Sequence, residues 1–176
     1  LEIFFGAAAI GATVVPFSTW STTRELEFLV QDSQITALFL IDSVSERSFV
    51  QALEHIYAAA PDAVANLKHV YVINADGMDD GINTNSRWPS YAEFLDPEAA
   101  FDVLPPGVGP SATDTAVVLY TSGSSAKPKS VPLTHAHALE NAFNIGERQG
   151  LTSSDRVLVP VPLFWSYGAI NALPAI

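Results

Sequence analysis

The chain has 176 residues, of which 48% are hydrophobic, so it is long and apolar enough to bury a core. It contains no cysteine, which excludes a disulfide framework, a thiolate zinc site and a cysteine nucleophile. The formal net charge of -11 arises within residues 1–110, since charges balance in residues 111–176, and this acidic balance argues against nucleic-acid binding.

The first part of the chain alternates between helical and strand-like patterns. Helices are predicted where apolar residues recur every three to four positions, and strands where short apolar runs occur. In chain order, the patterns predict a helix over Glu2–Gly11, a strand over Thr13–Phe17, a helix from Thr22 to about Asp32, a strand over Thr36–Ile41, a helix after Ser45, and a strand over His69–Ile73.

Polar residues mark the starts of two of these helices. Thr22, with Glu25 three residues later, fits a capping box, in which each residue satisfies a backbone N–H group of the other. Ser45 is the predicted N-cap of the next helix. The predicted apolar face of that helix consists of Phe49, Leu53 and Ile56.

The second part of the chain opens with a variable, turn-rich stretch from about residue 76 to 109, which includes one helical turn at Ser90–Leu95. The elements predicted after it are a strand over Ala116–Tyr120, a helix from Thr134 or His135 to about Gly150, and a buried strand over Arg156–Pro162. Helices that alternate with apolar strands predict an α/β fold with a layered parallel sheet and flanking helices.

A polar loop begins where the strand Ala116–Tyr120 should end. It combines four hydroxyl side chains and a glycine with Lys127 and Lys129. Backbone N–H groups and hydroxyls are directed donors, and lysines are point charges, so this composition suits a polyanion. Ligands of α/β folds bind at the carboxyl ends of strands. The loop is therefore predicted to bind the phosphate chain of a nucleotide.

The spacing of the loop residues argues against two other nucleotide-binding motifs. The Walker pattern and the dinucleotide-binding glycine pattern are both absent. Ser124–Lys127 fits S-x-x-K, the nucleophile motif of some acyl hydrolases and transferases, although the partner triplets S-D-N and K-T-G do not occur. A solvent-exposed turn between two strands is a further alternative.

The segment Thr121–Val131 resembles the phosphate-binding loop of the adenylate-forming (AMP-binding) enzymes, which include acyl- and aryl-CoA synthetases. That loop reads approximately T-S-G-[ST]-[ST]-G-x-P-K-G-V, and this chain departs from it at Ala126 and Ser130, where the family usually has glycine. Weaker matches follow the family's order along nearly the whole chain: Phe4–Pro16, Thr22–Leu26, Asp32 and Ser33, Leu133–His135, Asn141, and Val161–Gly168.

The resemblance implies that residues 1–176 are an incomplete N-terminal adenylation domain with its phosphate loop at 121–131. It implies ATP-dependent activation of a carboxylic acid as an acyl-adenylate, followed by transfer to a thiol, with ATP, Mg²⁺ and coenzyme A as cofactors. The intact protein is expected to be cytoplasmic, with a homodimer as one expected state. No signal peptide or membrane-length apolar run is visible in the sequence.

Roles for individual residues also follow from the resemblance. Lys129 is the expected catalytic residue, which offsets the charge that grows on the leaving pyrophosphate. The expected phosphate-binding residues are Thr121, Ser122, Gly123, Ser124, Ser125, Ala126, Lys127 and Lys129. The expected acyl-pocket residues are Trp165, Ser166 and Gly168. The family often has histidine where Trp165 stands, and an indole there either lines the acyl chain or belongs to the core.

Two departures from the family bear on activity. A side chain at Ala126 or Ser130 costs about 1 kcal/mol or more if the family backbone has positive φ there. A non-catalytic relative with a decayed loop is therefore a third hypothesis. The family keeps its adenine-binding aromatic, magnesium-binding glutamate, ribose-binding aspartate and a late catalytic lysine in segments that this chain lacks. This chain alone is accordingly expected to be inactive.

The histidines do not indicate a metal site. His135 and His137 are two positions apart, which places them on different faces of a helix. His135 is expected to support the start of its helix, and His55 and His69 stand alone in the sequence.

Overall fold

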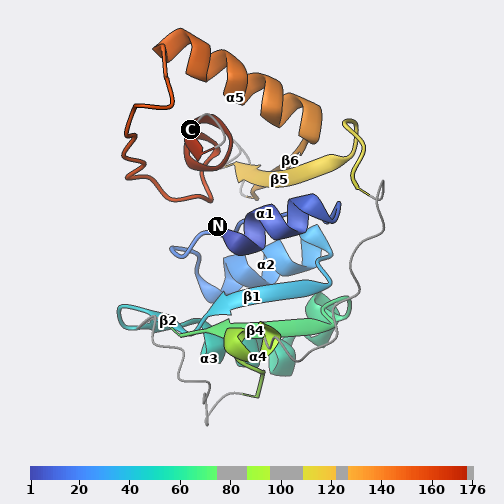
Figure 1. Cartoon of the computed structure of the whole chain (residues 1–176). Helices are drawn as coiled ribbons and strands as arrows, with labels where there is room; N and C mark the ends of the chain where they lie inside the picture. Colours follow the sequence, from blue (N-terminus) through green and yellow to red (C-terminus); the bar gives the residue numbers. More distant parts are fainter. Residues whose placement is uncertain (75–86, 96–108, 122–126, 174–176) are drawn as a thin grey trace. The chain divides into compact units, whose positions relative to one another are not determined.

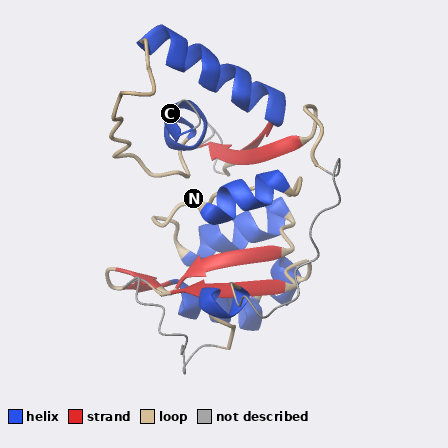
Figure 2. Cartoon of the chain, viewed as in Figure 1, coloured by secondary structure: helices blue, strands red, loops and turns tan. Residues whose placement is uncertain are grey.

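The computed structural model describes residues 1–74, 87–95, 109–121 and 127–173 (Figure 1). The chain divides into two compact units, each of which is described on its own. Thr19–Asp102 form one, called here the sheet unit. Leu1–Ser18 and Val103–Ile176 form the other, called here the hairpin unit. Figure 2 shows that each unit contains both helices and strands.

The sheet unit is centred on a parallel pair of strands, β1 (Ala37–Ile41) and β4 (His69–Ile73). Successive side chains of a strand point to opposite faces, so alternate residues of both strands share one face. The residues buried on one face pair across the ladder: Leu38 with Val70, and Leu40 with Val72. With the helices that flank this pair, the parallel α/β fold predicted from the sequence is confirmed.

Helices α2 (Thr23–Ser33) and α3 (Phe49–Ala59) and the 3₁₀ helix η1 (Pro61–Val64) complete the core of the sheet unit. α3 packs against β1 and α2, and η1 contacts both helices. Full burial of an apolar side chain such as leucine contributes about 1.5–3 kcal/mol. The predicted apolar face of α3 is confirmed, since all of its members are buried: Phe49, Leu53 and Ile56.

The predicted capping box at the start of α2 is confirmed. The backbone N–H of Thr22 donates to Oε2 of Glu25 at 2.7 Å, and the backbone N–H of Glu25 donates to Oγ1 of Thr22 at 3.3 Å. Two N–H groups that have no partner within the helix are thereby satisfied. The helix ends at Gln34, which has a φ of 55°.

The prediction that Ser45 caps α3 is wrong. Ser48 is the N-cap, because its hydroxyl accepts from the backbone N–H of Gln51 at 3.2 Å. Ser45 has a φ of 57° and lies between the short antiparallel strands β2 (Ser43–Val44) and β3 (Arg47–Ser48). A residue that precedes the first helical turn directly can reach its free N–H groups, whereas Ser45 is separated from that turn by β3.

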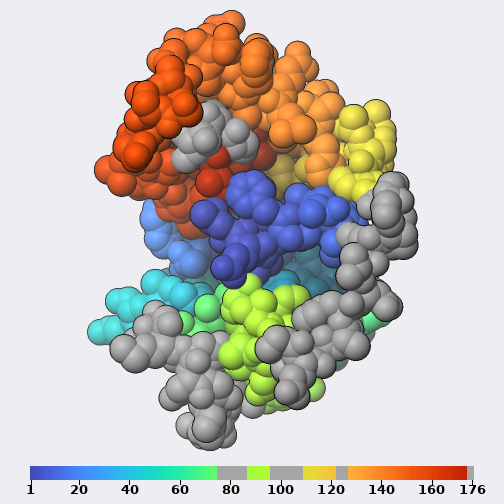
Figure 3. Space-filling model, in the orientation of Figure 1, coloured from blue at the N-terminus to red at the C-terminus, as the bar shows by residue number. Residues whose placement is uncertain are grey.

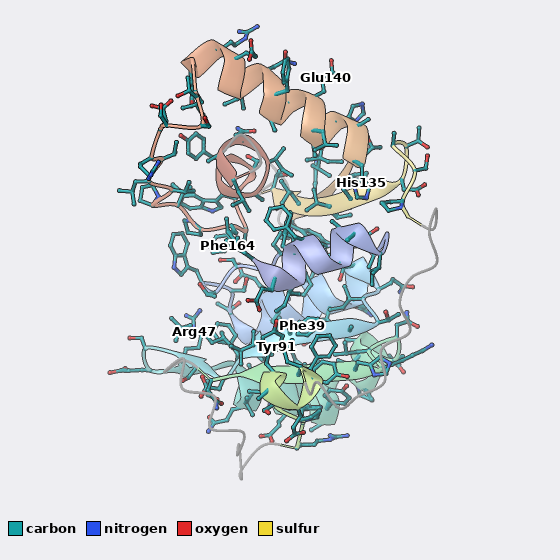
Figure 4. All side chains as sticks on the ribbon, in the orientation of Figure 1. Phe39, Arg47, Tyr91, His135, Glu140 and Phe164 are labelled. Atoms are coloured by element: carbon teal, nitrogen blue, oxygen red, sulfur yellow. The ribbon has the colours of Figure 1, made fainter. Side chains whose placement is uncertain are left out.

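The opposite face of the parallel pair carries a cluster of aromatic rings. Phe39 of β1 stacks on Tyr71 of β4 with ring centroids 5.5 Å apart. The short helix α4 (Tyr91–Phe94), capped by the Ser90 hydroxyl, adds two further rings to Phe39, at 5.9 Å and 5.1 Å. Figure 4 labels Phe39 and Tyr91 in this cluster. The helical turn predicted at Ser90–Leu95 is therefore confirmed.

The hairpin unit begins with α1 (Glu2–Ala9) and contains the antiparallel strands β5 (Thr115–Thr121) and β6 (Lys129–Thr134). The strand predicted at Thr13–Phe17 is reduced to a single parallel bridge between Val14 and Val117. The buried core of the hairpin unit consists of Val117, Leu119, Ala169 and Ile170. The partly buried residues packed against this core are Phe4, Val14, Leu133 and Ala138.

Helix α5 (His135–Gln149) follows β6 directly, as predicted. Thr134 caps it by accepting from the backbone N–H of His137 at 3.2 Å, and Gly150 ends it with a φ of 66°. Ala142 is buried on the inner side of α5. Figure 3 shows α5 in orange at the molecular surface. Two of its apolar residues are more than half exposed, Leu139 at 67% and Phe143 at 68%.

The buried strand predicted at Arg156–Pro162 is wrong. The structure has no strand there, and Leu158 is 84% exposed. An apolar run becomes a strand only where a neighbouring strand accepts its backbone hydrogen bonds. No described segment pairs with these residues. They instead lead into η2 (Tyr167–Ala172), a π-helix.

Candidate functional site

The predicted phosphate loop is described only at its two ends. Ser122, Gly123, Ser124, Ser125 and Ala126 lie outside the described residues. The described ends are Thr121, the last residue of β5, and residues 127–131, which lead into and form the start of β6. The described part of the candidate site therefore consists of the end of the β5–β6 hairpin and the elements that pack on it.

The register of the hairpin sets the direction of its terminal side chains. Thr121 lies opposite Lys129, and the Thr121 hydroxyl donates a long hydrogen bond of 3.5 Å to the Lys129 carbonyl oxygen. Residues directly opposite each other in an antiparallel pair share a face, and alternate residues of a strand do so as well. Thr121 and Lys129 therefore share the face of the buried residues Val117 and Leu119.

Both lysines of the predicted loop are exposed at this end of the hairpin. An ammonium group about 4 Å from a phosphate oxygen attracts it by roughly 4 kcal/mol at an effective dielectric near 20. The side chains of Lys127 and Lys129 thus lie on the solvent side of the hairpin end, from which an anionic ligand would approach.

The departure at Ser130 does not strain the backbone. Ser130 lies in β6 opposite Tyr120. Among the described residues other than glycine, positive φ occurs only at Gln34 and Ser45. A strand conformation is open to any residue, so the absence of glycine at Ser130 has no steric cost. Ala126, the other departure, lies outside the described residues.

The predicted acyl segment forms a tight turn before η2. The backbone N–H of Trp165 donates to the Pro162 carbonyl at 3.2 Å, and the N–H of Ala169 donates to the Trp165 carbonyl at 3.0 Å. Gly168 is buried against the same Pro162 carbonyl, whose oxygen would lie 2.5 Å from any added Cβ atom. Only glycine fits at Gly168 without moving the main chain.

The aromatic side chains of this turn are largely outside the core. Trp165 is 46% exposed and Tyr167 is 53% exposed. Phe164, labelled in Figure 4, contacts Trp165 edge to face with ring centroids 5.8 Å apart. The alternative that Trp165 is a core residue is therefore wrong in this structure. Ser166 is exposed beside it.

The turn and the hairpin meet through the core of the hairpin unit. Ala169 and Ile170 of η2 form a buried cluster with Val117 and Leu119 of β5. The segment that follows the predicted acyl turn thus packs on the hairpin face that also carries Lys129. Residues far apart in sequence are joined here, and the sequence patterns did not reveal this contact.

Asn141, to which the sequence analysis assigned no role, forms a polar link between two elements of the hairpin unit. Its Nδ2 donates to Oδ1 of Asn171 at 2.9 Å and, less closely, to the carbonyl oxygen of Ile170 at 3.4 Å. These bonds join α5 to η2. The only signal in the sequence was the match of Asn141 to the family pattern, which names the residue without its contact.

His135 occupies the first position of α5, where it was expected to support the helix start. Its backbone N–H donates to the carbonyl oxygen of Asp114 at 3.1 Å. Its ring Nε2 is buried and has no hydrogen-bond partner among the described residues. Figure 4 shows His135 at the junction of β6 and α5.

A closed polar turn follows α5. The backbone N–H and then the hydroxyl of Thr152 donate to Oδ2 of Asp155 at 2.7 Å and 2.8 Å. These bonds stabilise the carboxylate and hold the pKa of Asp155 below its ordinary value.

The described residues contain no cluster of three or more potential metal ligands of the His, Cys, Asp or Glu type. None of the described helices is both long and apolar enough to cross a bilayer.

Solved structures identify the class of protein to which this fold belongs. The anthranilate CoA ligase AuaEII, in complex with anthranoyl-AMP, matches with a TM-score of 0.74 over 98% of this chain and 30% of its own, at 22% identity. ATP-bound MatB from Rhodopseudomonas palustris matches with a TM-score of 0.72 over the same 98% and 30%, at 19% identity. The fold is that of the N-terminal domain of adenylate-forming enzymes.

The family itself follows from the sequence. The model of the AMP-binding enzyme family matches residues 1–176, so the chain belongs to that family. The acyl-CoA ligase SID4 from Ajellomyces capsulatus is 26% identical over 181 residues, covering 99% of this chain and 29% of the ligase. The chain thus spans under a third of the length of that ligase. The predicted membership in the adenylate-forming family is confirmed.

Proposed function

We propose that the protein activates a carboxylic acid with ATP and transfers the acyl group to a thiol, as an acyl-CoA ligase does. The observation that carries this proposal is the family loop sequence, which connects the paired strands β5 and β6 and includes the exposed residues Lys127 and Lys129. Relatives that are named acyl-CoA ligases support the same reaction class.

The reaction has two balanced steps. A carboxylate oxygen attacks the α-phosphorus of ATP, the bond to the bridging oxygen breaks, and pyrophosphate leaves with its electron pair. A thiolate, expected to be that of coenzyme A, then attacks the acyl carbon, and AMP leaves. Catalysis of the first step depends on positioning and on stabilising the negative charge that develops on pyrophosphate.

The hairpin end supplies groups suited to that first step. We assign phosphate contacts to the loop residues Thr121, Ser122, Gly123, Ser124, Ser125, Ala126 and Lys127, as hydroxyl, backbone or ammonium donors. Lys129 is assigned the catalytic role of neutralising the leaving pyrophosphate. Mg²⁺ would accompany ATP, and no described residue is assigned to hold it.

The turn that precedes η2 is assigned to the acyl group. Trp165 and Ser166 are exposed there, and the absence of a side chain at Gly168 lets the main chain close tightly. An exposed indole offers an apolar surface to the acyl portion of the substrate, and unlike histidine it does not titrate. We place the acyl chain against this surface.

We further propose that the active unit is longer than residues 1–176, which would serve as part of its N-terminal adenylation domain and be inactive alone. The proposal is supported by the relatives SID4 and sidI, because the chain covers only 29% of the length of each. A cytoplasmic location and a homodimeric state are part of the same proposal.

The first prediction tests Lys129. In the complete gene product, Lys129→Ala should lower carboxylate-dependent exchange of pyrophosphate into ATP about 100-fold or more, in line with the loss of one charge-stabilising group. The matched control is Lys68→Ala, which removes an exposed lysine of the sheet unit and should leave exchange unchanged. Isotope exchange measured at saturating carboxylate reports the result.

The alternatives give different results in the same protein. An S-x-x-K acyl enzyme would be labelled covalently at Ser124 by an acylating probe without ATP. A non-catalytic relative would bind no ATP in calorimetry. Either result, together with an absence of carboxylate-dependent exchange in the unmodified protein, would overturn the ligase proposal.

A further inference from the structure

The side-chain amide of Asn141 links helix α5 to η2. It lies on the inner side of α5 and is partly buried, while its neighbour Glu140 points outward in Figure 4. Its Nδ2 donates to Oδ1 of Asn171 at 2.9 Å and to the Ile170 carbonyl oxygen at 3.4 Å. Both acceptors belong to the second half of η2.

These bonds connect the two segments to which the proposed function gives chemical roles. α5 follows β6 without an intervening loop, and β6 begins at Lys129. η2 follows the turn that contains Trp165 and Gly168. Asn141 therefore ties the helix behind the phosphate hairpin to the helix behind the acyl turn.

Both halves of η2 contribute to one buried cluster with β5, through Ala169 and Ile170, and the second half also bonds to Asn141. The first half is fixed by the close approach of Gly168 to Pro162 and by the burial of Ala169 against β5. The second half contains the two acceptors of Asn141. π-Helices are rare and usually short, because their wider turn packs less well than an α-helical turn. Contacts from outside such a helix therefore matter for its geometry.

We propose that Asn141 is a positioning residue for the carboxylate substrate. It fixes η2 against α5, and through η2 it holds the Trp165 turn at a constant place relative to the phosphate hairpin. It does not touch substrate. The inference rests on the proposed function, because the turn is assigned to the acyl group only there.

The test is kinetic and uses the complete gene product. Asn141→Ala should raise the KM for the carboxylate about 2- to 12-fold in the ATP–pyrophosphate exchange assay, as expected for the loss of hydrogen bonding. The KM for ATP should change by less than about twofold, because no phosphate contact is removed. Asn144→Ala is the matched control, since Asn144 is an exposed asparagine one turn further along α5.

The acceptor side supplies a second variant if Asn141→Ala does not fold. Asn171→Ala should raise the carboxylate KM in the same way, whereas Asn171→Asp keeps an oxygen acceptor and should restore much of the loss. Hydrogen exchange followed by mass spectrometry should show faster exchange of residues 167–173 in Asn141→Ala than in Asn144→Ala.

Separate outcomes overturn the two proposals. If Lys129→Ala abolishes exchange but Asn141→Ala matches Asn144→Ala in the carboxylate KM, the role of Asn141 is refuted and the ligase function stands. Equal rises in both KM values would also refute it, since they indicate general disruption. If the unmodified protein shows no carboxylate-dependent exchange, the proposed function fails, and with it the positioning role.

Discussion

Gly168 shows how a single missing side chain shapes the candidate site. A Cβ atom at this position would lie 2.5 Å from the Pro162 carbonyl oxygen and 3.3 Å from Cα of Leu163. Both neighbours are main-chain atoms, which cannot rotate away as the end of a flexible side chain can. The turn that carries Trp165 thus depends on glycine for its closure.

We predict that Gly168→Ala opens this turn. It should destabilise the protein by about 1–3 kcal/mol, the usual cost of overpacking, and it should raise the KM for the carboxylate. The control is Gly6→Ala in α1, where an added Cβ atom meets nothing within 4 Å. That substitution should stabilise the helix by about 0.5–1 kcal/mol. Denaturant midpoints of the two variants give the comparison, and a neutral Gly168→Ala would contradict the packing argument.

Among the helices, α2 begins with a capping box whose hydrogen bonds also affect the protonation of Glu25. The Thr22 backbone N–H and then its hydroxyl donate to Glu25, and these bonds hold the pKa of the Glu25 carboxyl below its ordinary value. A lowered folded-state pKa means that the charged form stabilises the fold. This contribution is complete above the unfolded-state pKa and is lost as the pH falls through the folded-state pKa.

The lowered pKa of Glu25 leads to a prediction for the stability of α2. Thr22→Ala should destabilise the protein by about 1 kcal/mol at pH 7, as expected for the loss of an N-cap. The difference in unfolding free energy from the unmodified protein should shrink as the pH falls through the lowered pKa of Glu25, where the carboxylate becomes protonated. Thr23→Ala, next to the cap but outside the capping box, is the control. Urea unfolding at several pH values measures the stability of both variants. If the destabilisation by Thr22→Ala were the same at every pH, the Glu25 carboxylate would not contribute to the stability of the capping box.

The elements that were predicted correctly are those whose signals are local. The capping box at Thr22, the apolar runs of β1 and β4, and the helix that starts after Thr134 depend on neighbours within a few residues. Ser45 was misassigned because three serines precede α3, at positions 43, 45 and 48, and the β2–β3 pairing decides which of them caps the helix. The apolar run after Arg156 resembles a strand, but no described strand accepts it.

For the whole molecule, the sequence predicted the class of fold and the strand that leads into the proposed phosphate loop. It did not predict which side chains join the elements behind that loop and the proposed acyl turn. The contact of Asn141 with Asn171 and the packing of Ala169 on Val117 depend on tertiary structure, because neither has a periodic or turn signal. Local patterns thus predicted the segments of the candidate site, while the contacts between these segments depend on the tertiary structure.

The pairing between Val14 and Val117 also constrains how the protein is made. The Thr13 hydroxyl donates to the carbonyl oxygen of Thr115, 102 positions further along the chain. A ribosome that adds roughly 5–20 residues per second needs about 5–20 s to supply this partner. Throughout that interval Phe4 of the nascent α1 segment lacks the β5 residues against which it packs in the folded chain. Newly made chains should therefore depend on chaperone protection of the α1 segment until translation has passed β5.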